Sequence, residues 1–97
     1  MGAEVFIEVS RGKDAQEAFD AAVKGAQYDY GHAGYTGTIA EKTEFVMIDC
    51  PENKDPEEYA EDLIDESDDR IRNKWGPAGC IKLKEEGEFL FFGVASS

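Results

Sequence analysis

Residues 80–95 read C-I-K-L-K-E-E-G-E-F-L-F-F-G-V-A, which is the pattern of a β-hairpin. The first five residues alternate apolar side chains with two lysines, as a strand with one inward face does. Glu86-Gly87 is a tight-turn signal, and residues 88–95 provide the partner strand. We therefore predict that the chain ends in an antiparallel strand pair onto which the preceding elements pack.

Besides a short strand over residues 35–42, two further strands are predicted upstream of this hairpin. Residues 4–9 (E-V-F-I-E-V) alternate, and the pattern places Val5, Ile7 and Val9 on the inward face. Residues 44–50 (E-F-V-M-I-D-C) are almost continuously apolar, which predicts a central strand of the sheet.

Two helices are predicted between the strands. The first begins at Asp14, an N-cap with Glu17 three residues on, and keeps an apolar face as far as Ala26. The second begins at Asp55, which is followed by proline at the first helical position, and is expected to run to about Trp75.

The predicted order is strand, helix, short strand (residues 35–42), strand, helix, strand, strand. This order indicates a single globular domain over residues 1–97 of the α+β class. We expect a two-layer sandwich, with both helices on one face of a mainly antiparallel sheet of four or five strands. The topology would be a βαββαβ core with one extra strand at the C-terminus.

The chain is strongly acidic, with 22 acidic and 10 basic residues and a formal net charge of −12. Such a field repels phosphate backbones and anionic membranes, so neither direct nucleic-acid binding nor membrane binding is expected. The sequence shows no signal peptide and no apolar run long enough to span a bilayer, which predicts a cytoplasmic protein. Cys50 and Cys80 are expected to be reduced structural thiols.

The second predicted helix carries a concentrated acidic face. Its acidic residues fall within one half of the helical wheel: Glu57, Glu58, Glu61, Asp62, Asp65, Glu66, Asp68 and Asp69. Repulsive pairs at i,i+4 outnumber attractive ones by three, a cost of ~1 kcal/mol that mixed charges would avoid. We interpret the face as a binding surface for a basic partner protein, including one that normally binds nucleic acid. The alternatives are a solvated face and a divalent-ion site, and a regular helix splays its carboxylates too far for the latter.

A second candidate site lies in residues 28–42, Y-D-Y-G-H-A-G-Y-T-G-T-I-A-E-K. Clustered tyrosine with glycine is typical of recognition surfaces. The candidate ligand or partner contacts are Tyr28, Asp29, His32, Tyr35, Thr36, Thr38 and Glu41. His32 is a possible general acid or base with Asp29 orienting it, but no catalytic constellation, metal site or cofactor motif emerges. The alternative is a structural turn between the first helix and the sheet.

Part of this stretch, G-H-A-G-Y-T-G-T-I-A-E-K, resembles a string found in small bacteriophage and bacterial proteins. The resemblance covers about a dozen residues and implies a phage or prophage origin, with no activity attached. Small acidic phage proteins often bind and block a host factor, which would place this protein in the host cytoplasm.

Three functions are therefore open. The favoured one is an acidic interaction or inhibitor protein, in the extreme case a nucleic-acid mimic, that binds a basic partner through the second helix. The second is a ligand-binding or enzymatic domain with its site at residues 28–42. The third is a homo-oligomer, because residues 88–92 place large apolar groups on both faces of the last strand, or because an edge strand is exposed.

Overall fold

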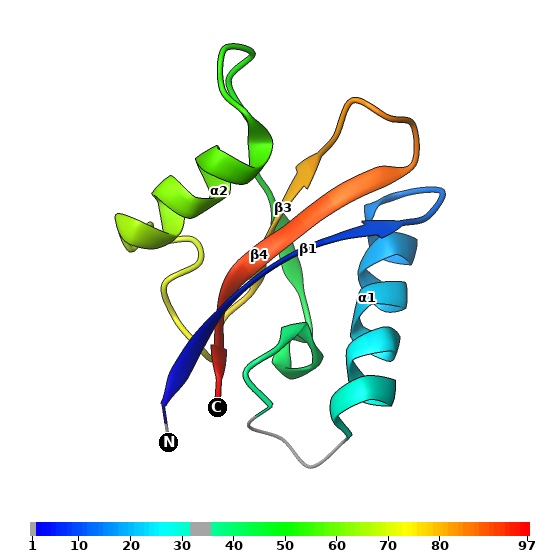
Figure 1. Cartoon of the computed structure of the whole chain (residues 1–97), viewed down its shortest axis with the longest axis vertical. Helices are drawn as coiled ribbons and strands as arrows, with labels where there is room; N and C mark the ends of the chain where they lie inside the picture. Colours follow the sequence, from blue (N-terminus) through cyan, green and yellow to red (C-terminus); the bar gives the residue numbers. More distant parts are fainter. Residues whose placement is uncertain (1, 32–35) are drawn as a thin grey trace.

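The computed structural model describes residues 2–31 and 36–97. This part of the chain forms a four-stranded sheet, two α-helices and a short 3-10 helix (Figure 1). In chain order the elements are β1 (Ala3–Arg11), α1 (Ala15–Tyr30), η1 (Ile39–Glu41), β2 (Phe45–Met47), α2 (Pro56–Asp65), β3 (Ala78–Lys82) and β4 (Glu88–Ser96). The predicted α+β class is confirmed.

The strand order in the sheet is β1-β4-β3-β2. β4 is antiparallel to both β1 and β3, whereas β2 is parallel to β3. The sheet is mainly antiparallel, as predicted. The expectation that residues 44–50 form a central strand is wrong, because β2 is a three-residue edge strand. Its run is apolar because Phe45 packs with the core under α1 while Val46 packs with the core under α2.

β4 is buried on both faces, and this determines where the helices lie. Phe89 and Phe91 belong to the cluster under α1, whereas Leu90 and Phe92 belong to the cluster under α2. Each of the four is at most 5% exposed. The helices therefore pack on opposite faces of the sheet (Figure 1), and the expectation that both cover one face is wrong. The large side chains of β4 are covered within one chain.

The predicted inward face of β1 is only partly correct. Phe6 is only 8% exposed, whereas Val5 and Val9 are 56% and 53% exposed. Phe6 pairs with Gly93 of β4, and a Cβ on that glycine would lie 3.5 Å from the Phe6 ring. The Phe6 ring therefore packs beside this glycine, and Ile7 of the predicted face packs partly buried against the cluster that contains Ala60 and Leu63 of α2.

α1 begins as predicted. The Asp14 carboxylate accepts a hydrogen bond from the backbone N–H of Glu17 at 2.9 Å. Small residues on the buried face, including Ala18 and Ala22, let the helix approach the sheet closely. The helix continues to Tyr30 and ends where Gly31 adopts a φ of +89°.

α2 ends at Asp65, well before the predicted end near Trp75. Ser67 adopts a φ of +53°, and the backbone N–H of Asp68 donates to the carbonyl oxygen of Leu63 at 3.0 Å. This is the Schellman arrangement, in which a residue in the left-handed region terminates the helix. Glycine usually occupies that position, so the sequence contains no obvious stop signal there.

The predicted short strand over residues 35–42 is also wrong for its described part. Residues 36–38 form a bend that leads into η1 (Ile39–Glu41), and Lys42 is its C-cap. Thr38 caps this short helix, because its hydroxyl accepts a hydrogen bond from the N–H of Ala40 at 3.2 Å. A local side-chain bond of this kind competes with strand pairing.

Candidate functional site

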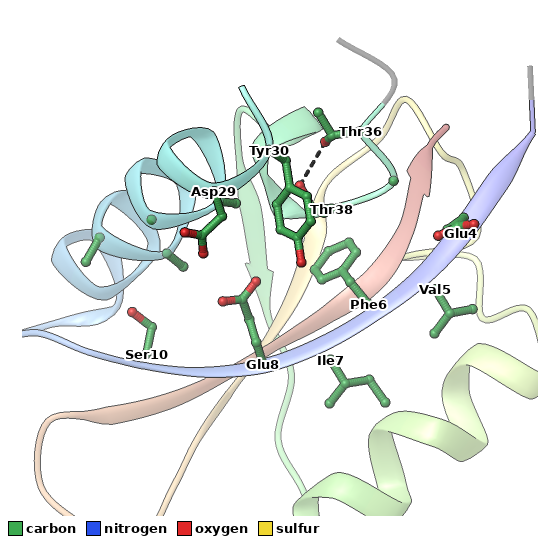
Figure 2. Close-up of a pocket in the computed structure, with 15 residues that line it drawn as sticks. Glu4, Val5, Phe6, Ile7, Glu8, Ser10, Asp29, Tyr30, Thr36 and Thr38 are labelled. Carbon is green, nitrogen blue, oxygen red and sulfur yellow. Dashed lines mark hydrogen bonds between the residues drawn. The ribbon is translucent and has the colours of Figure 1, made fainter. Parts of the chain in front are cut away.

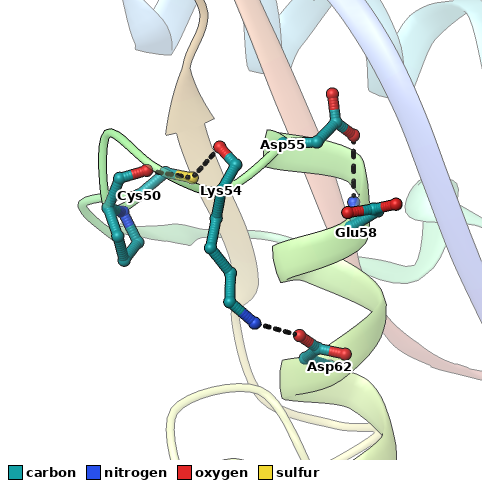
Figure 3. A network of polar contacts seen from close by, with 6 residues as sticks. Cys50, Lys54, Asp55, Glu58 and Asp62 are labelled. Atoms are coloured by element: carbon teal, nitrogen blue, oxygen red, sulfur yellow. Dashed lines mark hydrogen bonds and ion pairs between the residues drawn. The ribbon is translucent and has the colours of Figure 1, made fainter.

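The acidic surface begins at the N-terminus of α2. The Asp55 carboxylate accepts a hydrogen bond from the N–H group of Glu57 at 3.1 Å. It also accepts one from the N–H group of Glu58 at 3.2 Å (Figure 3). Ala60 and Leu63 are buried against the sheet. The opposite side of the helix therefore faces solvent.

The structure divides the predicted acidic residues into two groups. Those within α2 are Glu57, Glu58, Glu61, Asp62 and Asp65, and Glu66 caps its C-terminus. Asp68 and Asp69 lie beyond Ser67, outside the regular helix. The expectation that all of these residues share one helical face is wrong, because the left-handed residue redirects the chain.

Three of these carboxylates already have basic partners. Asp62 pairs with Lys54 at 2.7 Å (Figure 3), Asp68 with Arg70 at 2.9 Å, and Asp69 with Arg72 at 3.2 Å. The hydrogen bond to Asp62 is the main cause that raises the pKa of Lys54, and the hydrogen bonds from Arg70 lower the pKa of Asp68.

The other carboxylates at α2 have no ion-pair partner within residues 2–31 and 36–97. They are Glu57, Glu58, Glu61, Asp65 and Glu66, and all are exposed. We call this set the α2 acidic face.

The second half of the 28–42 stretch is held together by its own polar groups. The Thr36 hydroxyl donates to the Glu41 carboxylate at 2.8 Å, and the Thr36 N–H donates to the same oxygen at 3.1 Å. The hydroxyls of Thr36 and Thr38 lie 2.8 Å apart. These three predicted contact residues thus bond to one another and build the turn.

Lys42 is a structural residue that the sequence did not reveal. It is 3% exposed, and its ammonium donates to the carbonyl oxygens of Asn73, Lys74 and Gly76 at 3.4, 3.2 and 2.9 Å. Burial lowers the pKa of Lys42 to about 8. These hydrogen bonds connect the turn after α2 to the end of η1.

The remaining predicted contacts diverge. Tyr28 is 91% exposed, whereas Asp29, Thr36 and Thr38 line a hollow beside α1. His32 and Tyr35 lie outside the described residues. The structure therefore places Asp29, Thr36 and Thr38 around one hollow and leaves Tyr28 in solvent.

This hollow is a groove of about 650 Å³ between β1 and α1 (Figure 2). Phe6 and the small residues Ala22 and Gly25 form part of its apolar lining. Glu8 points from β1 toward the α1 side, and both burial and the neighbouring Asp29 carboxylate raise its pKa. No lysine or arginine lines the groove among residues 2–31 and 36–97.

Sequence reasoning missed the β1 side of this groove. Glu4, Glu8 and Ser10 all line it, and all have the same parity on the strand. The alternation of residues 4–9 contains that signal, but apolar side chains of the opposite parity favour the other face as the buried one.

The described residues show no metal centre or activated thiol. No group of three or more His, Cys, Asp or Glu within them could hold a metal ion. Burial is the main cause that raises the pKa of Cys50, and it raises the pKa of Cys80 to about 12. No helix in residues 2–31 and 36–97 is long and apolar enough to cross a membrane.

The chain matches no protein-family model, no curated protein and no solved structure.

Proposed function

We propose that this is a small acidic interaction protein that binds a basic surface of a partner protein through the α2 acidic face. The observation that supports this most is the set of exposed carboxylates on α2 and its C-cap without a basic partner in the described chain. A cationic surface would relieve the repulsion between these carboxylates, so association lowers an energy that the free protein carries.

The charge spacing also favours a partner that binds nucleic acid. The ten residues of α2 span about 15 Å at about 1.5 Å per residue. Five carboxylates on that length give one negative charge per roughly 3 Å, close to the roughly 3.4 Å per phosphate along one strand of DNA. Lys54 neutralises one of the five. We infer a phage-type inhibitor of a host nucleic-acid-binding protein, acting in the host cytoplasm, as the most specific form of the proposal.

The test uses charge neutralisation with a matched control. The test variant combines Glu57→Gln, Glu61→Gln and Asp65→Asn, and it leaves the Lys54–Asp62 pair intact. The control combines Glu44→Gln, Glu85→Gln and Glu86→Gln, which are exposed carboxylates away from α2. Both variants change the net charge by the same amount.

Immobilised protein would be used to capture partners from cells of its natural source, with affinity then measured for the purified partner. We expect the test variant to weaken binding by about tenfold or more and the control by less than about threefold. Raising salt from about 0.1 M to about 1 M shortens the Debye length from about 10 Å to about 3 Å and should release the partner. Equal weakening in both variants would reduce the role of α2 to net charge alone and contradict the proposal.

A ligand site at residues 28–42 is the second candidate, and the groove beside Asp29, Thr36 and Thr38 favours it. A small cation is the ligand class that the carboxylates there would suit. Alanine at Asp29 should then abolish binding of such a ligand without lowering stability, because no hydrogen bond of its side chain holds the described fold together.

A further inference from the structure

β1 leaves one edge of the sheet unpaired. It is a terminal strand of the sheet, nine residues long, and follows an uninterrupted register with β4. Gly2 exchanges both backbone hydrogen bonds with Ser97, and Gly12 donates to the carbonyl of Gly87 at 3.0 Å. These bonds fix the phase of the antiparallel ladder, in which every second residue points its N–H and C=O toward β4.

The other residues of β1 direct their backbone groups outward. Because Gly2 and Gly12 bond to the strand partner, the residues with outward backbone groups are the odd-numbered ones. These are Ala3, Val5, Ile7, Val9 and Arg11. No backbone or side-chain group in the described part of the chain bonds to these outward N–H and C=O groups. They form a row of donors and acceptors spaced for another strand.

Side chains along this edge differ in chemistry between the two faces. Val5 and Ile7 point to the α2 side, and Phe6 and Glu8 to the α1 side (Figure 2). A strand added at this edge would place alternate side chains on each face, because directly opposed residues share a face. One set would cover exposed valines, and the other would enter the groove beside α1.

The groove is negatively charged along its length. Glu4 and Glu8 come from β1 and Asp29 from α1, and no lysine or arginine is among the described residues that line it. Tyr30, which is 64% exposed, also lines it and offers aromatic surface for the aliphatic stem of a long cationic side chain.

We propose that β1 binds an extended segment of a partner protein as an added fifth strand, antiparallel to β1, with lysine or arginine at alternate positions in the groove and β-branched apolar residues between them. Main-chain hydrogen bonds would provide affinity, and the alternating charge would provide specificity. This site is separate from the α2 acidic face and does not depend on it.

A second copy of the chain is a poorer occupant of this edge. An antiparallel β1–β1 pair centred on Ile7 would bring the Glu8 carboxylates of both copies into diagonal positions about 7–8 Å apart. Each copy also carries a formal net charge of −12. A carboxylate in the middle of an edge strand disfavours self-pairing and selects a basic strand.

The experiment uses a capped peptide in which valine and lysine alternate over the length of β1. Its control has the same composition with all lysines in one block, so both peptides carry the same charge. We expect the alternating peptide to bind about tenfold more tightly. Equal affinities would mean charge attraction alone and overturn the proposal.

Backbone methylation tests the strand pairing directly. Valines opposite Val5, Ile7 and Val9 supply the N–H groups that face β1 in this geometry. N-methylation of the valines should abolish binding, whereas N-methylation of the lysines should change affinity by less than about threefold. The reverse order, or no difference, contradicts the pairing.

Amide hydrogen exchange identifies the edge on the protein. In the free protein the N–H groups of Val5, Ile7 and Val9 should exchange rapidly, and peptide binding should slow them. The N–H groups of Phe6 and Glu8 should be protected in both states. Outward amides that stay unprotected in the complex would overturn the proposal, as would outward amides already protected in the free protein by self-association.

Two protein variants complete the test. Val5→Pro removes one outward N–H and leaves the hydrogen bonds to β4 in place, and Glu8→Gln removes the central charge of the groove. Each variant should lower the affinity for the alternating peptide by about fivefold or more, while Glu86→Gln should leave that affinity unchanged. Glu8→Gln keeps the test decisive if the proline variant does not fold.

Discussion

The ammonium of Lys42 lies 2.9 Å from the carbonyl oxygen of Gly76, in a place where only 3% of the lysine is exposed. The two residues are far apart in sequence, and the contact joins η1 to the turn that follows α2. Two further carbonyls, from Asn73 and Lys74, accept from the same ammonium. The cation thus satisfies three backbone acceptors that would otherwise lack this donor.

Replacing this cation should destabilise the protein. Lys42→Met keeps most of the side-chain volume but leaves the carbonyls of Asn73, Lys74 and Gly76 without their donor. We expect the free energy of unfolding to fall by about 2 kcal/mol in a denaturant titration. The control is Lys84→Met, an exposed lysine, which should change stability by less than about 0.5 kcal/mol. Equal losses of stability in Lys42→Met and Lys84→Met would contradict the structural role of Lys42.

Much of the fold could be predicted because local patterns act over short distances. The terminal hairpin, both helix starts and the α+β class follow from alternation and capping. The placement of the helices could not be predicted in the same way. Large apolar groups on both faces of a strand are compatible with a subunit contact or with a helix on each side, and in β4 a helix covers each face.

The candidate site was harder to predict, because polar residues serve both folding and binding. Thr36, Thr38 and Glu41 have the composition of a binding site, yet their side chains bond to one another. Only the three-dimensional structure shows that Thr36 and Thr38 build the turn and also line the groove beside Asp29. Glu8, the other carboxylate beside Asp29 in that groove, lies far away in sequence, and only the fold brings the two together.

The end of α2 gives a prediction with a distinctive sign. Ser67 occupies the left-handed region with φ +53°, which glycine adopts more readily. Ser67→Gly should therefore stabilise the protein by about 0.5–1 kcal/mol, measured by chemical denaturation.

A longer second helix would reverse the sign of the Ser67→Gly effect. In a helix that continued to residue 75, glycine at this position would destabilise by about 0.5–1 kcal/mol. Ser67→Ala is the matched control and should not stabilise, because alanine is disfavoured at positive φ. A stabilising alanine together with a destabilising glycine would support the longer helix.

Two glycines should respond oppositely to alanine. A Cβ on Gly79 would lie 2.6 Å from the Phe92 ring, which is fully buried and cannot move aside. Gly79→Ala should lower the free energy of unfolding by about 2–3 kcal/mol. Gly25 lies inside α1 with no atom within 4 Å of the added Cβ, so Gly25→Ala should raise it by about 0.5–1 kcal/mol. Thermal denaturation of the pair measures both, and equal signs would contradict the packing around Gly79.

Stability should also depend on alkaline pH through two buried groups with opposite signs. Burial lowers the pKa of Lys42 from 10.5 to about 8, so between these values the unfolded chain keeps a proton that the folded chain has lost. The free energy of unfolding therefore rises with pH across that window. Burial raises the pKa of Cys80 from 9.0 to about 12, so the unfolded chain loses that proton first and the contribution of Cys80 falls as pH rises.

Variants separate the two effects. Denaturation of the unmodified protein, Lys42→Met and Cys80→Ala would be compared at about pH 7, below the pKa values of both groups, and at about pH 10. The higher pH lies between the folded and unfolded pKa values of each group. The stability difference between the unmodified protein and Lys42→Met should increase with pH, because only the unmodified protein gains from deprotonating the buried ammonium. The difference from Cys80→Ala should decrease with pH, because only a chain with the thiol gains by unfolding and ionising. A constant difference for Lys42→Met would show that the ammonium keeps its ordinary pKa, and its three carbonyl acceptors would then fully replace the water that it loses on burial.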